Sequence, residues 1–448
     1  MQRTAAYLTR NTPRYTSYPT APHFSDAVGA DSYEAWLEEL DPAAPVSLYL
    51  HVPFCKQVCW YCGCNMKLAA RYEPVSDYLT MLLQEIDLLA ERLPTRMKVS
   101  CIHWGGGTPT TLKPDDLARA VDALRRRFDF CDDAEIAIES DPRTLGHEMI
   151  QRIGALGFNR ASFGGQEFDP DVQQAINRIQ PPDMVRRSVE GLREAGVQGI
   201  NFDLIYGLPK QTEATLARTI DLAAAMAPDR VALFGYAHVP WMAKKQRMID
   251  TADLPGAAER LAQSARAAAK LLEHGYRAIG LDHFARPDDA LAHAAAEGTL
   301  RRNFQGYTTD QAETLLGLGA TSIGRTPHGY VQNIAETGAW ARAVSEKRLP
   351  VGRGVAFSGE DKLRGHVIEQ LMCFGAVDLA EAGRLHSAGP DWARFERQAL
   401  AEMAADDLLT VEGDRLALTE AGKPLVRVVA AVFDAYLAKS AARHSVAV

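Results

Sequence analysis

The stretch LYLHVPFCKQVCWYCGCNM, residues 48–66, sets the pattern from which the rest of the chain can be interpreted. Residues 46–52 alternate in the manner of a short buried strand, and Pro53 ends it because proline cannot donate to a sheet ladder. The loop that follows carries four cysteines, the first three with the spacing C-x3-C-x2-C: Cys55, Cys59, Cys62 and Cys64. The sequence therefore predicts a loop of thiols directly after a first strand.

Thiolates this close together in a chain can converge on one metal centre. Their spacing is too cramped for the paired C-x2-C knuckles of a structural zinc site, and three soft ligands on one flexible loop favour an iron–sulfur cluster. A four-iron cluster held by only three thiolates keeps one iron open, and a small molecule can chelate there. The alternative is that Cys64 completes a four-thiolate zinc site, which would be colourless.

The composition predicts a soluble, cytoplasmic protein. The chain has 448 residues, enough for two or three domains, and its formal net charge of −8 disfavours nucleic acid or an anionic membrane as the main partner. No segment approaches the ~18 uninterrupted apolar residues of a membrane span, and the first thirty residues lack the apolar run of a signal peptide. Four of the seven cysteines lie within ten residues, unlike a secreted disulfide framework.

Apolar strand-like segments alternate with amphipathic segments from residue 46 onward. Residues 75–93, for example, repeat leucines at the helical period. Six strands separated by helices predict an α/β fold with a parallel sheet and helices outside it, which is a partial (β/α)6 barrel. The predicted strands are 46–52, 99–104, 134–139, 159–163, 199–206 and 230–236.

The polar residues of these segments gather where the strands end. Chemistry in such barrels collects at the carboxyl ends of the strands, so these groups are predicted to share one face. In strand order they are the cysteine loop, GGGTPT (105–110), Glu139, Gln166, Asp203 and GYAH (235–238).

Two of these features suggest how a ligand is held. Three consecutive glycines expose backbone, so GGGTP can hold the amino acid end of a chelating methionine. Glu139 leaves an apolar strand and is costly to bury unpaired, so it meets either a cation or ribose hydroxyls, or else a barrel arginine in a structural salt bridge. Asp203, between Phe202 and Leu204, has the same two alternatives.

The order of the cysteine loop, the three glycines, Glu139 and Asp203 resembles that of the radical S-adenosylmethionine enzymes. Longer blocks narrow the resemblance, from Arg14 to the C-terminal region, to the family of oxygen-independent coproporphyrinogen III oxidases, also called dehydrogenases. The blocks are PRYTSYPT (13–20), HVPFCKQVCWYCGCN (51–65), HWGGGTPT (103–110), GFNR (157–160), DLIYGLPKQT (203–212), YAHVP (236–240), DHFARPDD (282–289) and NFQGYTT (303–309).

The resemblance implies an oxidoreductase of haem biosynthesis with one 4Fe-4S cluster and two molecules of S-adenosylmethionine. In the family, a 5′-deoxyadenosyl radical removes a β-hydrogen from each of two propionates of coproporphyrinogen III, and loss of carbon dioxide leaves the vinyl groups of protoporphyrinogen IX. An electron donor and a final acceptor are implied, and the sequence identifies neither. The alternative is a haem chaperone of the same superfamily, which Cys64, the PRYTSYPT arm and the full-length tail disfavour.

The family's site residues carry over onto matching positions of this sequence. The implied cluster ligands are Cys55, Cys59 and Cys62. The implied contacts of the first S-adenosylmethionine, of which Tyr49 and Glu139 are also the expected catalytic residues, are Tyr49, Gly106 and Glu139. Those of the second are Tyr61, Gly107, Thr108, Gln166, Arg178, Asp203, Ala237 and Ile323. Tyr61 replaces a familiar phenylalanine, and Gly165 replaces a branched residue, which is expected to loosen the pocket wall beside Gln166.

Three further regions flank the predicted barrel, residues 46–280. The arm 1–45 cannot be a regular helix over PRYTSYPT, and its Arg14 either ties the arm to the body or covers the active-site mouth and meets a substrate carboxylate. Residues 281–359 are predicted to lie over the barrel mouth, with GLGATSIG (317–324) as a loop there. Residues 360–448 are predicted to form a helical, winged-helix-like domain that covers the substrate, because fourteen Asp/Glu against ten Lys/Arg disfavour DNA. We expect a monomer.

Overall fold

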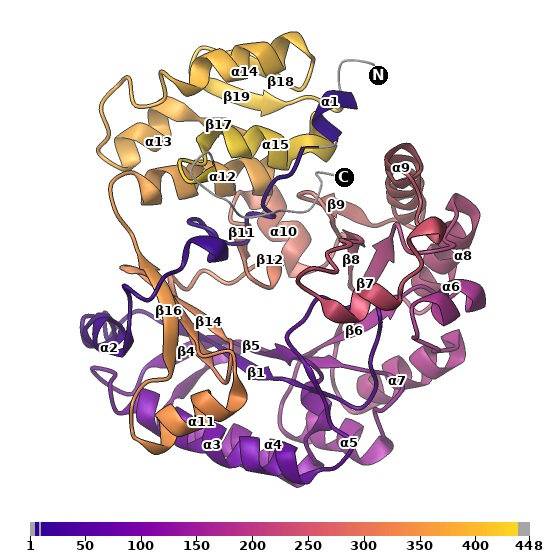
Figure 1. The fold of residues 1–448 in the computed structure, drawn as a ribbon, viewed down its shortest axis with the longest axis vertical. Coiled ribbons are helices and arrows are strands. Elements are labelled where there is room, and N and C mark those ends of the chain that lie inside the picture. The colour runs from indigo at the N-terminus through magenta and orange to yellow at the C-terminus, as the bar shows by residue number, and fades with distance from the viewer. Residues whose placement is uncertain (1–4, 9, 438–448) are drawn as a thin grey trace.

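A parallel six-stranded unit lies at the centre of the computed structural model, which describes residues 5–8 and 10–437 (Figure 1). Its neighbouring strands follow chain order and all run parallel. They are β1 (Val46–Val52), β4 (Lys98–Gly106), β5 (Asp129–Ser140), β6 (Arg160–Gln166), β7 (Gly199–Tyr206) and β8 (Arg230–Gly235). The partial (β/α)6 barrel is confirmed, although β5 begins at Asp129 rather than at residue 134.

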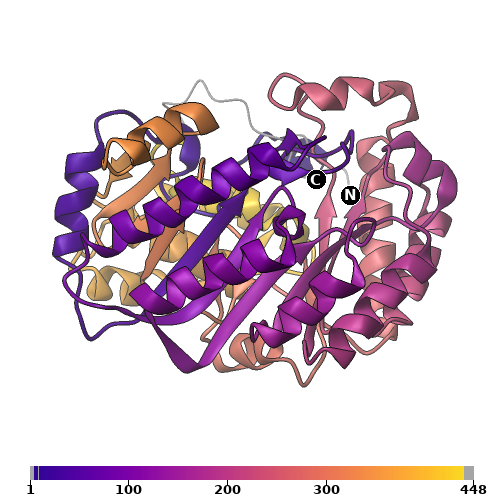
Figure 2. The ribbon, with the colours of Figure 1, turned by 90° about the horizontal axis from the view of Figure 1, so that it is seen from below.

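Helices cover the outside of this unit (Figure 2). They are α3 (Glu73–Ala90), α4 (Pro114–Arg127), α5 (His147–Ala155), α6 (Pro170–Ala175), α7 (Pro182–Glu194) and α8 (Glu213–Ala224). Each longer helix buries one apolar face against the sheet; α3 does so through Leu79, Leu82 and Ile86, none of which is exposed to solvent. The helices and the sheet thus bury their apolar faces against each other. The strand ends are the part of the barrel where polar groups stay accessible.

The sheet continues beyond β1, where a loop over the barrel mouth was expected. Strand β13 (Thr314–Leu318) pairs parallel with β1, and β14 (Ile323–Thr326), β15 (Gly329–Asn333) and β16 (Val351–Ala356) follow antiparallel. The prediction is wrong for these residues because β13 is wholly buried and completes the open edge of β1. The glycine-rich 317–324 segment is the tight reversal between β13 and β14, with a positive φ of 91° at Gly319.

A buried carboxyl joins this extension to the barrel. Glu85 of α3, 2% exposed, accepts hydrogen bonds from the Gly319 amide (2.7 Å), Asn333 Nδ2 (2.6 Å) and Trp340 Nε1 (3.2 Å). Trp340 lies on α11 (Thr337–Ser345). Burial raises the pKa of Glu85 to about 8, against the opposing effect of these three donors.

Glu85→Ala should lower the free energy of unfolding by about 3 kcal/mol, because three buried donors lose their acceptor. Chemical denaturation measures this, and the exposed Glu346→Ala should change stability by no more than ~0.5 kcal/mol. Since the folded pKa lies above the unfolded one, the folded state binds the extra proton, and wild-type stability relative to Glu85→Gln should fall as pH rises from about 5 to 8. A Glu85→Ala protein as stable as the wild type would contradict the assigned role.

The opposite edge of the sheet is closed by a short hairpin. Strand β10 (His283–Ala285) pairs antiparallel with both β8 and β9 (Arg277–Ile279), which follow the long helix α9 (Ala257–Glu273). Helix α10 (Ala290–Glu297) and the hairpin of β11 (Arg301–Asn303) and β12 (Gly306–Thr308) follow. Among the described residues, no helix combines the length and the hydropathy that crossing a membrane requires.

A second lobe with its own apolar core follows the sheet and runs from orange to yellow in Figure 1. Its elements are α12 (Asp361–Phe374), β17 (Ala376–Asp378), α13 (Leu379–Leu385), α14 (Glu396–Ala405), β18 (Leu409–Glu412), β19 (Arg415–Leu418) and α15 (Val426–Ala430). Strands β18 and β19 form a hairpin around Gly413 and Asp414, and β17 pairs with β19 as a third strand. Helices around a small three-stranded sheet match the winged-helix-like shape that was expected.

The N-terminal arm joins this lobe to the barrel. Its helices are α1 (Ala5–Leu8) and α2 (Ala30–Glu38), and PRYTSYPT between them has no regular helix, as expected. The side chains of Tyr15 and Tyr18 lie in the core of the C-terminal lobe, where Tyr15 donates to Asp434 Oδ2 (3.0 Å) and Tyr18 Oη accepts from the Ala435 amide (3.0 Å). The arm therefore crosses from one lobe to the other.

Candidate active site

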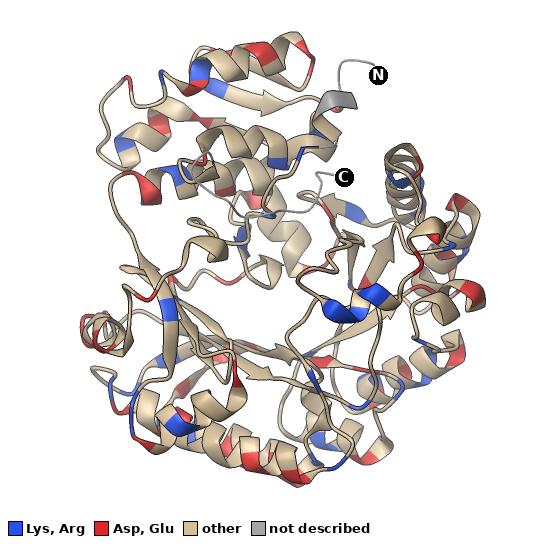
Figure 3. Cartoon of the chain, in the orientation of Figure 1, with Lys and Arg blue, Asp and Glu red and all other residues tan. Residues whose placement is uncertain are grey.

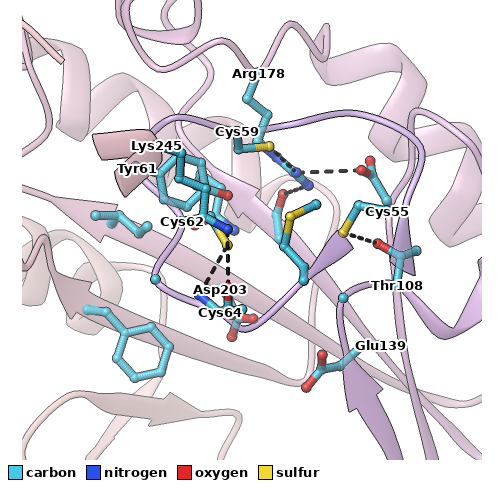
Figure 4. A pocket seen from close by; sticks show the side chains of 18 of the residues that line it. Cys55, Cys59, Tyr61, Cys62, Cys64, Thr108, Glu139, Arg178, Asp203 and Lys245 are labelled. Carbon is cyan, nitrogen blue, oxygen red and sulfur yellow. Dashed lines mark hydrogen bonds and ion pairs between the residues drawn. The ribbon is translucent and has the colours of Figure 1, made fainter. Parts of the chain in front are cut away.

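One cavity of about 400 Å³ lies at the carboxyl ends of the strands (Figure 4). Its size is in the usual range for small-molecule sites. Twelve of the site residues predicted from the sequence line it: Cys55, Cys59, Tyr61, Cys62, Gly106, Gly107, Thr108, Glu139, Gln166, Arg178, Asp203 and Ala237. The remaining two, Tyr49 and Ile323, do not line it.

The thiol loop is held by the chain around it. It begins at β2 (Phe54–Cys55), which pairs with β3 (Lys67–Leu68), and the Trp60 amide donates to the Ile176 carbonyl (3.0 Å). Asn177 Nδ2 donates to the Val58 carbonyl (2.7 Å). Backbone contacts at both ends and in the middle fix where the loop presents its sulfurs.

The three predicted ligands have different acid–base environments. Burial raises the pKa of the Cys55 thiol to about 11, although Thr108 Oγ1 at 3.5 Å opposes the shift. A hydrogen bond from Cys64, and after it the charge of Lys245, lower the pKa of Cys62 to about 6. Cys62 is therefore ready to bind a metal at neutral pH, whereas metal binding at Cys55 has to displace a proton.

Two guanidinium groups donate to the third sulfur. Arg143 Nη2 lies 3.2 Å and Arg178 Nη1 3.4 Å from Cys59 Sγ, and Asp141 bridges both arginines at 2.6 and 3.6 Å. Arg178 was predicted from the sequence, whereas Asp141 and Arg143 were not. The sequence did hold a signal for both residues, because they lie in SDPRT (140–144), directly after the predicted strand 134–139.

Glu139 has a histidine partner rather than the arginine that was considered. His103 Nε2 lies 3.1 Å from Glu139 Oε1, and the Gly106 amide donates to Oε2 (3.2 Å). Burial alone would raise the pKa of Glu139, but His103 and this amide outweigh it and the pKa is lowered, so the carboxylate is ionised at neutral pH. Tyr49 does not line the cavity, but it stacks on His103 with ring centroids 6.0 Å apart and so supports the partner of Glu139.

Packing also requires the three glycines, in addition to the ligand approach that was predicted from the sequence. A Cβ on Gly106 would lie 2.7 Å from the His51 ring, and φ there is +114°. A Cβ on Gly107 would lie 2.7 Å from the Phe54 backbone. Protein groups already fill these directions, so side chains are excluded even without a ligand.

Asp203 and Gln166 face the cavity from β7 and β6. Burial, and then the charge of Glu139, raise the pKa of Asp203 to about 7, and its side chain has no hydrogen bond or ion pair to any described residue. Gln166 has a positive φ of 54°, and its buried Oε1 has no hydrogen-bond partner in the part of the chain that the structure describes. Both groups are thus left for a ligand.

The expectation for Gly165 is wrong. A Cβ there would meet Leu204 Cδ2 at 3.1 Å, so this position faces the core, and the neighbouring Gly164 lines the cavity instead. A branched residue at 165 would press on Leu204, and its absence does not loosen the wall beside Gln166.

The donor set fits an iron–sulfur cluster with a bound nucleoside. Within residues 5–8 and 10–437, no three histidine, cysteine or carboxylate side chains converge closely enough for a single metal ion. In a cluster each thiolate binds a different iron, so its ligands need not converge on one point, and the free thiols of Cys55, Cys59 and Cys62 all line this cavity. The unpartnered Gln166 Oε1 and the Asp203 carboxyl are suited to amide, amine or hydroxyl donors of a second ligand.

Comparison with known proteins agrees with this geometry and defines the class of protein. The Radical SAM superfamily matches residues 49–223, and the HemN C-terminal domain matches residues 357–425. The chain is therefore a radical S-adenosylmethionine enzyme, a class whose members carry a 4Fe-4S cluster and S-adenosylmethionine.

Full-length relatives identify the family within that class. An oxygen-independent coproporphyrinogen III oxidase of Bradyrhizobium diazoefficiens is 48% identical over 99% of this chain and 98% of its own length, and that of Escherichia coli is 40% identical over 96% and 94%. The solved structure of coproporphyrinogen III oxidase from Escherichia coli superposes with a TM-score of 0.90 at 39% identity, over 95% of this chain and 98% of the other. The chain belongs to the family of oxygen-independent coproporphyrinogen III oxidases.

Proposed function

We propose that this protein converts coproporphyrinogen III to protoporphyrinogen IX in haem biosynthesis, without oxygen, by oxidative decarboxylation of two propionates. One observation carries the proposal. This chain is similar to the named oxidases over its whole length, and its fold brings the thiol loop, Glu139 and Gly106 to one cavity. The haem-chaperone alternative has no support among these relatives. Each propionate gives up a β-hydrogen atom, one electron and carbon dioxide as it becomes a vinyl group.

The residues have separable roles in this reaction. Cys55, Cys59 and Cys62 would hold the cluster, and Gly106 and Glu139 would bind the first S-adenosylmethionine. When bound, these groups supply a 5′-deoxyadenosyl radical, which is the cofactor's own chemistry. The protein's own contribution is to hold the reactants in a fixed orientation within the cavity.

A second S-adenosylmethionine position is part of the proposal for the same cavity. Of the eight residues predicted for it, seven line the cavity, and Arg178 and Asp203 supply groups of opposite charge there. Arg178 suits a carboxylate and Asp203 suits an amine or hydroxyl. Ile323, in β14 of the sheet extension, is left out of this proposed position because it does not line the cavity.

Arg14 is the proposed partner of a substrate propionate. It lies on the arm, lines the cavity, and donates from Nη2 to the Gly235 carbonyl at 3.0 Å. An exposed guanidinium held by one neutral acceptor keeps its remaining donors for a carboxylate. Both interpretations of the arm are thus compatible, since Tyr15 and Tyr18 tie it down while Arg14 lies at the mouth.

An anaerobic product assay tests the function. With coproporphyrinogen III, a reductant and S-adenosylmethionine, the reconstituted protein should release carbon dioxide and form protoporphyrinogen IX through a three-propionate intermediate. Arg14→Ala should keep the cluster and S-adenosylmethionine cleavage while decarboxylation falls about tenfold or more, because only substrate positioning is lost. Tight haem binding with no decarboxylated product would replace the enzyme by the chaperone alternative.

A further inference from the structure

A ten-residue segment between β8 and α9 lies directly against the thiol loop. This segment, residues 239–248, includes the short helix η3 (Lys244–Met248). Gln246 Nε2 donates to the Tyr61 carbonyl (2.7 Å), and Lys245 Nζ donates to the Cys64 carbonyl (3.1 Å). These two contacts place the 239–248 segment beside the loop that carries the predicted cluster ligands.

The outer surface of the 239–248 segment is apolar to an unusual degree. Trp241 is 49% exposed, Met242 73% and Met248 60%, and these are three of only ten large exposed apolar side chains among the described residues. Single exposed apolar side chains are ordinary, but a group of them on one short segment is typical of an interaction site. Methionine is suited to such a surface because its side chain adapts to different partners.

The same segment is basic in an acidic protein (Figure 3). Residues 53–72 and 239–248 together contain six Lys or Arg and no Asp or Glu, although the whole chain has a net charge of −8. Lys244 and Arg247 are exposed and form no ion pair with any residue that the structure describes. The positive charge beside the thiol loop is thus available to an external partner.

We propose that the 239–248 segment is the docking surface for a small acidic one-electron carrier protein that reduces the cluster. The inference rests on the proposed function, in which each reaction needs an electron from outside. An apolar centre with unpaired cations suits a transient complex, because charge steers the encounter while a small contact area permits rapid release. On docking, the carrier is oxidised by one electron and the iron of the cluster is reduced by one.

Charge reversal of the two free cations tests the surface. The variant Lys244→Glu/Arg247→Glu, which leaves Lys245 and Gln246 in place, is compared with the wild type by anaerobic stopped-flow measurement of cluster reduction by reduced flavodoxin, an acidic flavin carrier. At low ionic strength the second-order rate should fall about tenfold or more, and most of its salt dependence should disappear. Reduction by dithionite, and turnover with dithionite, should stay at wild-type rates.

A matched control reverses two other free cations. Lys98 begins β4 at the amino ends of the strands, and Arg187 lies on α7; both are exposed and have no ion pair among the described residues. Lys98→Glu/Arg187→Glu changes the net charge equally and should leave reduction by flavodoxin within about twofold of the wild type. Met242→Ser should raise the flavodoxin concentration needed for half-maximal rate without changing the KM for coproporphyrinogen III.

The possible results separate this inference from the proposed function. An unchanged flavodoxin rate, or an equal loss in the control variant, would overturn the docking surface. A raised KM for the porphyrinogen with dithionite would also overturn it and assign the segment to substrate entry. Absence of protoporphyrinogen IX from the wild type with dithionite would instead refute the proposed function, and the comparison of reduction rates would still decide the docking surface.

Discussion

Alanine in place of Cys55, Cys59 or Cys62 is expected to abolish iron binding and all turnover. The wild type, reconstituted anaerobically, should be brown and bind about four irons per chain. Each of these sulfurs lines the cavity, and a cluster that keeps one iron open for S-adenosylmethionine has no spare protein ligand. Iron analysis and the visible spectrum of each variant measure the loss.

Cys64→Ala is the matched control for these three variants. Cys64 also lines the cavity, but its backbone amide and thiol serve Cys62, whose sulfur accepts from the Cys64 amide at 3.4 Å. The variant keeps that amide and should retain its iron, with turnover reduced by no more than about tenfold. If Cys64→Ala also lost its iron, ligation by four thiolates would replace the open-site assignment.

Glu139→Gln is expected to weaken binding of S-adenosylmethionine roughly tenfold to a hundredfold, while the melting temperature changes little. The ionised carboxylate supplies charge-assisted hydrogen bonds, each worth about 1.5–3 kcal/mol to a bound cofactor. Glutamine retains an oxygen for His103 or for the Gly106 amide, so the local fold should persist. Equilibrium dialysis on the reconstituted protein and a thermal unfolding scan give the two quantities.

Glu135→Gln, in the same strand, should show the reverse pattern. Glu135 pairs with Arg160 at 3.0 Å, lies just after the register shift between β4 and β5, and does not line the cavity. Its loss should lower the melting temperature by several degrees and leave cofactor binding intact. A Glu139→Gln protein that melts earlier and binds S-adenosylmethionine normally would show that Glu139 is structural.

The sequence predicted those parts of the fold that depend on local pattern. The bounds of β1 and β7 were correct to the residue, because alternating or continuous apolar runs end there at Pro53 and Gly207. The sheet extension was not foreseen, since a glycine-rich hairpin and a surface loop have the same local composition. A strand hairpin is distinguished from a surface loop here only by the pairing of β13 with β1, which joins residues more than 250 positions apart.

The site shows the same division between local and long-range information. Cysteine spacing, strand order and the family resemblance together placed twelve residues around one cavity, but His103, Arg143 and Lys245 were missed. Histidine, arginine and lysine are common at surfaces, and their roles here arise from contacts with Glu139, Cys59 and Cys64 that only the folded chain creates. The prediction for Gly165 was wrong for a related reason. The register between β6 and β7 shifts at this point, and Gly164 lines the cavity in place of Gly165.

The arm that ends at the cavity also sets an order of events during synthesis. Arg14 reaches the mouth only when Tyr15 and Tyr18 are anchored, and their partners Asp434 and Ala435 are made more than four hundred residues later. The part of the cavity wall that Arg14 supplies is therefore complete only after the C-terminal lobe has been made and holds the arm.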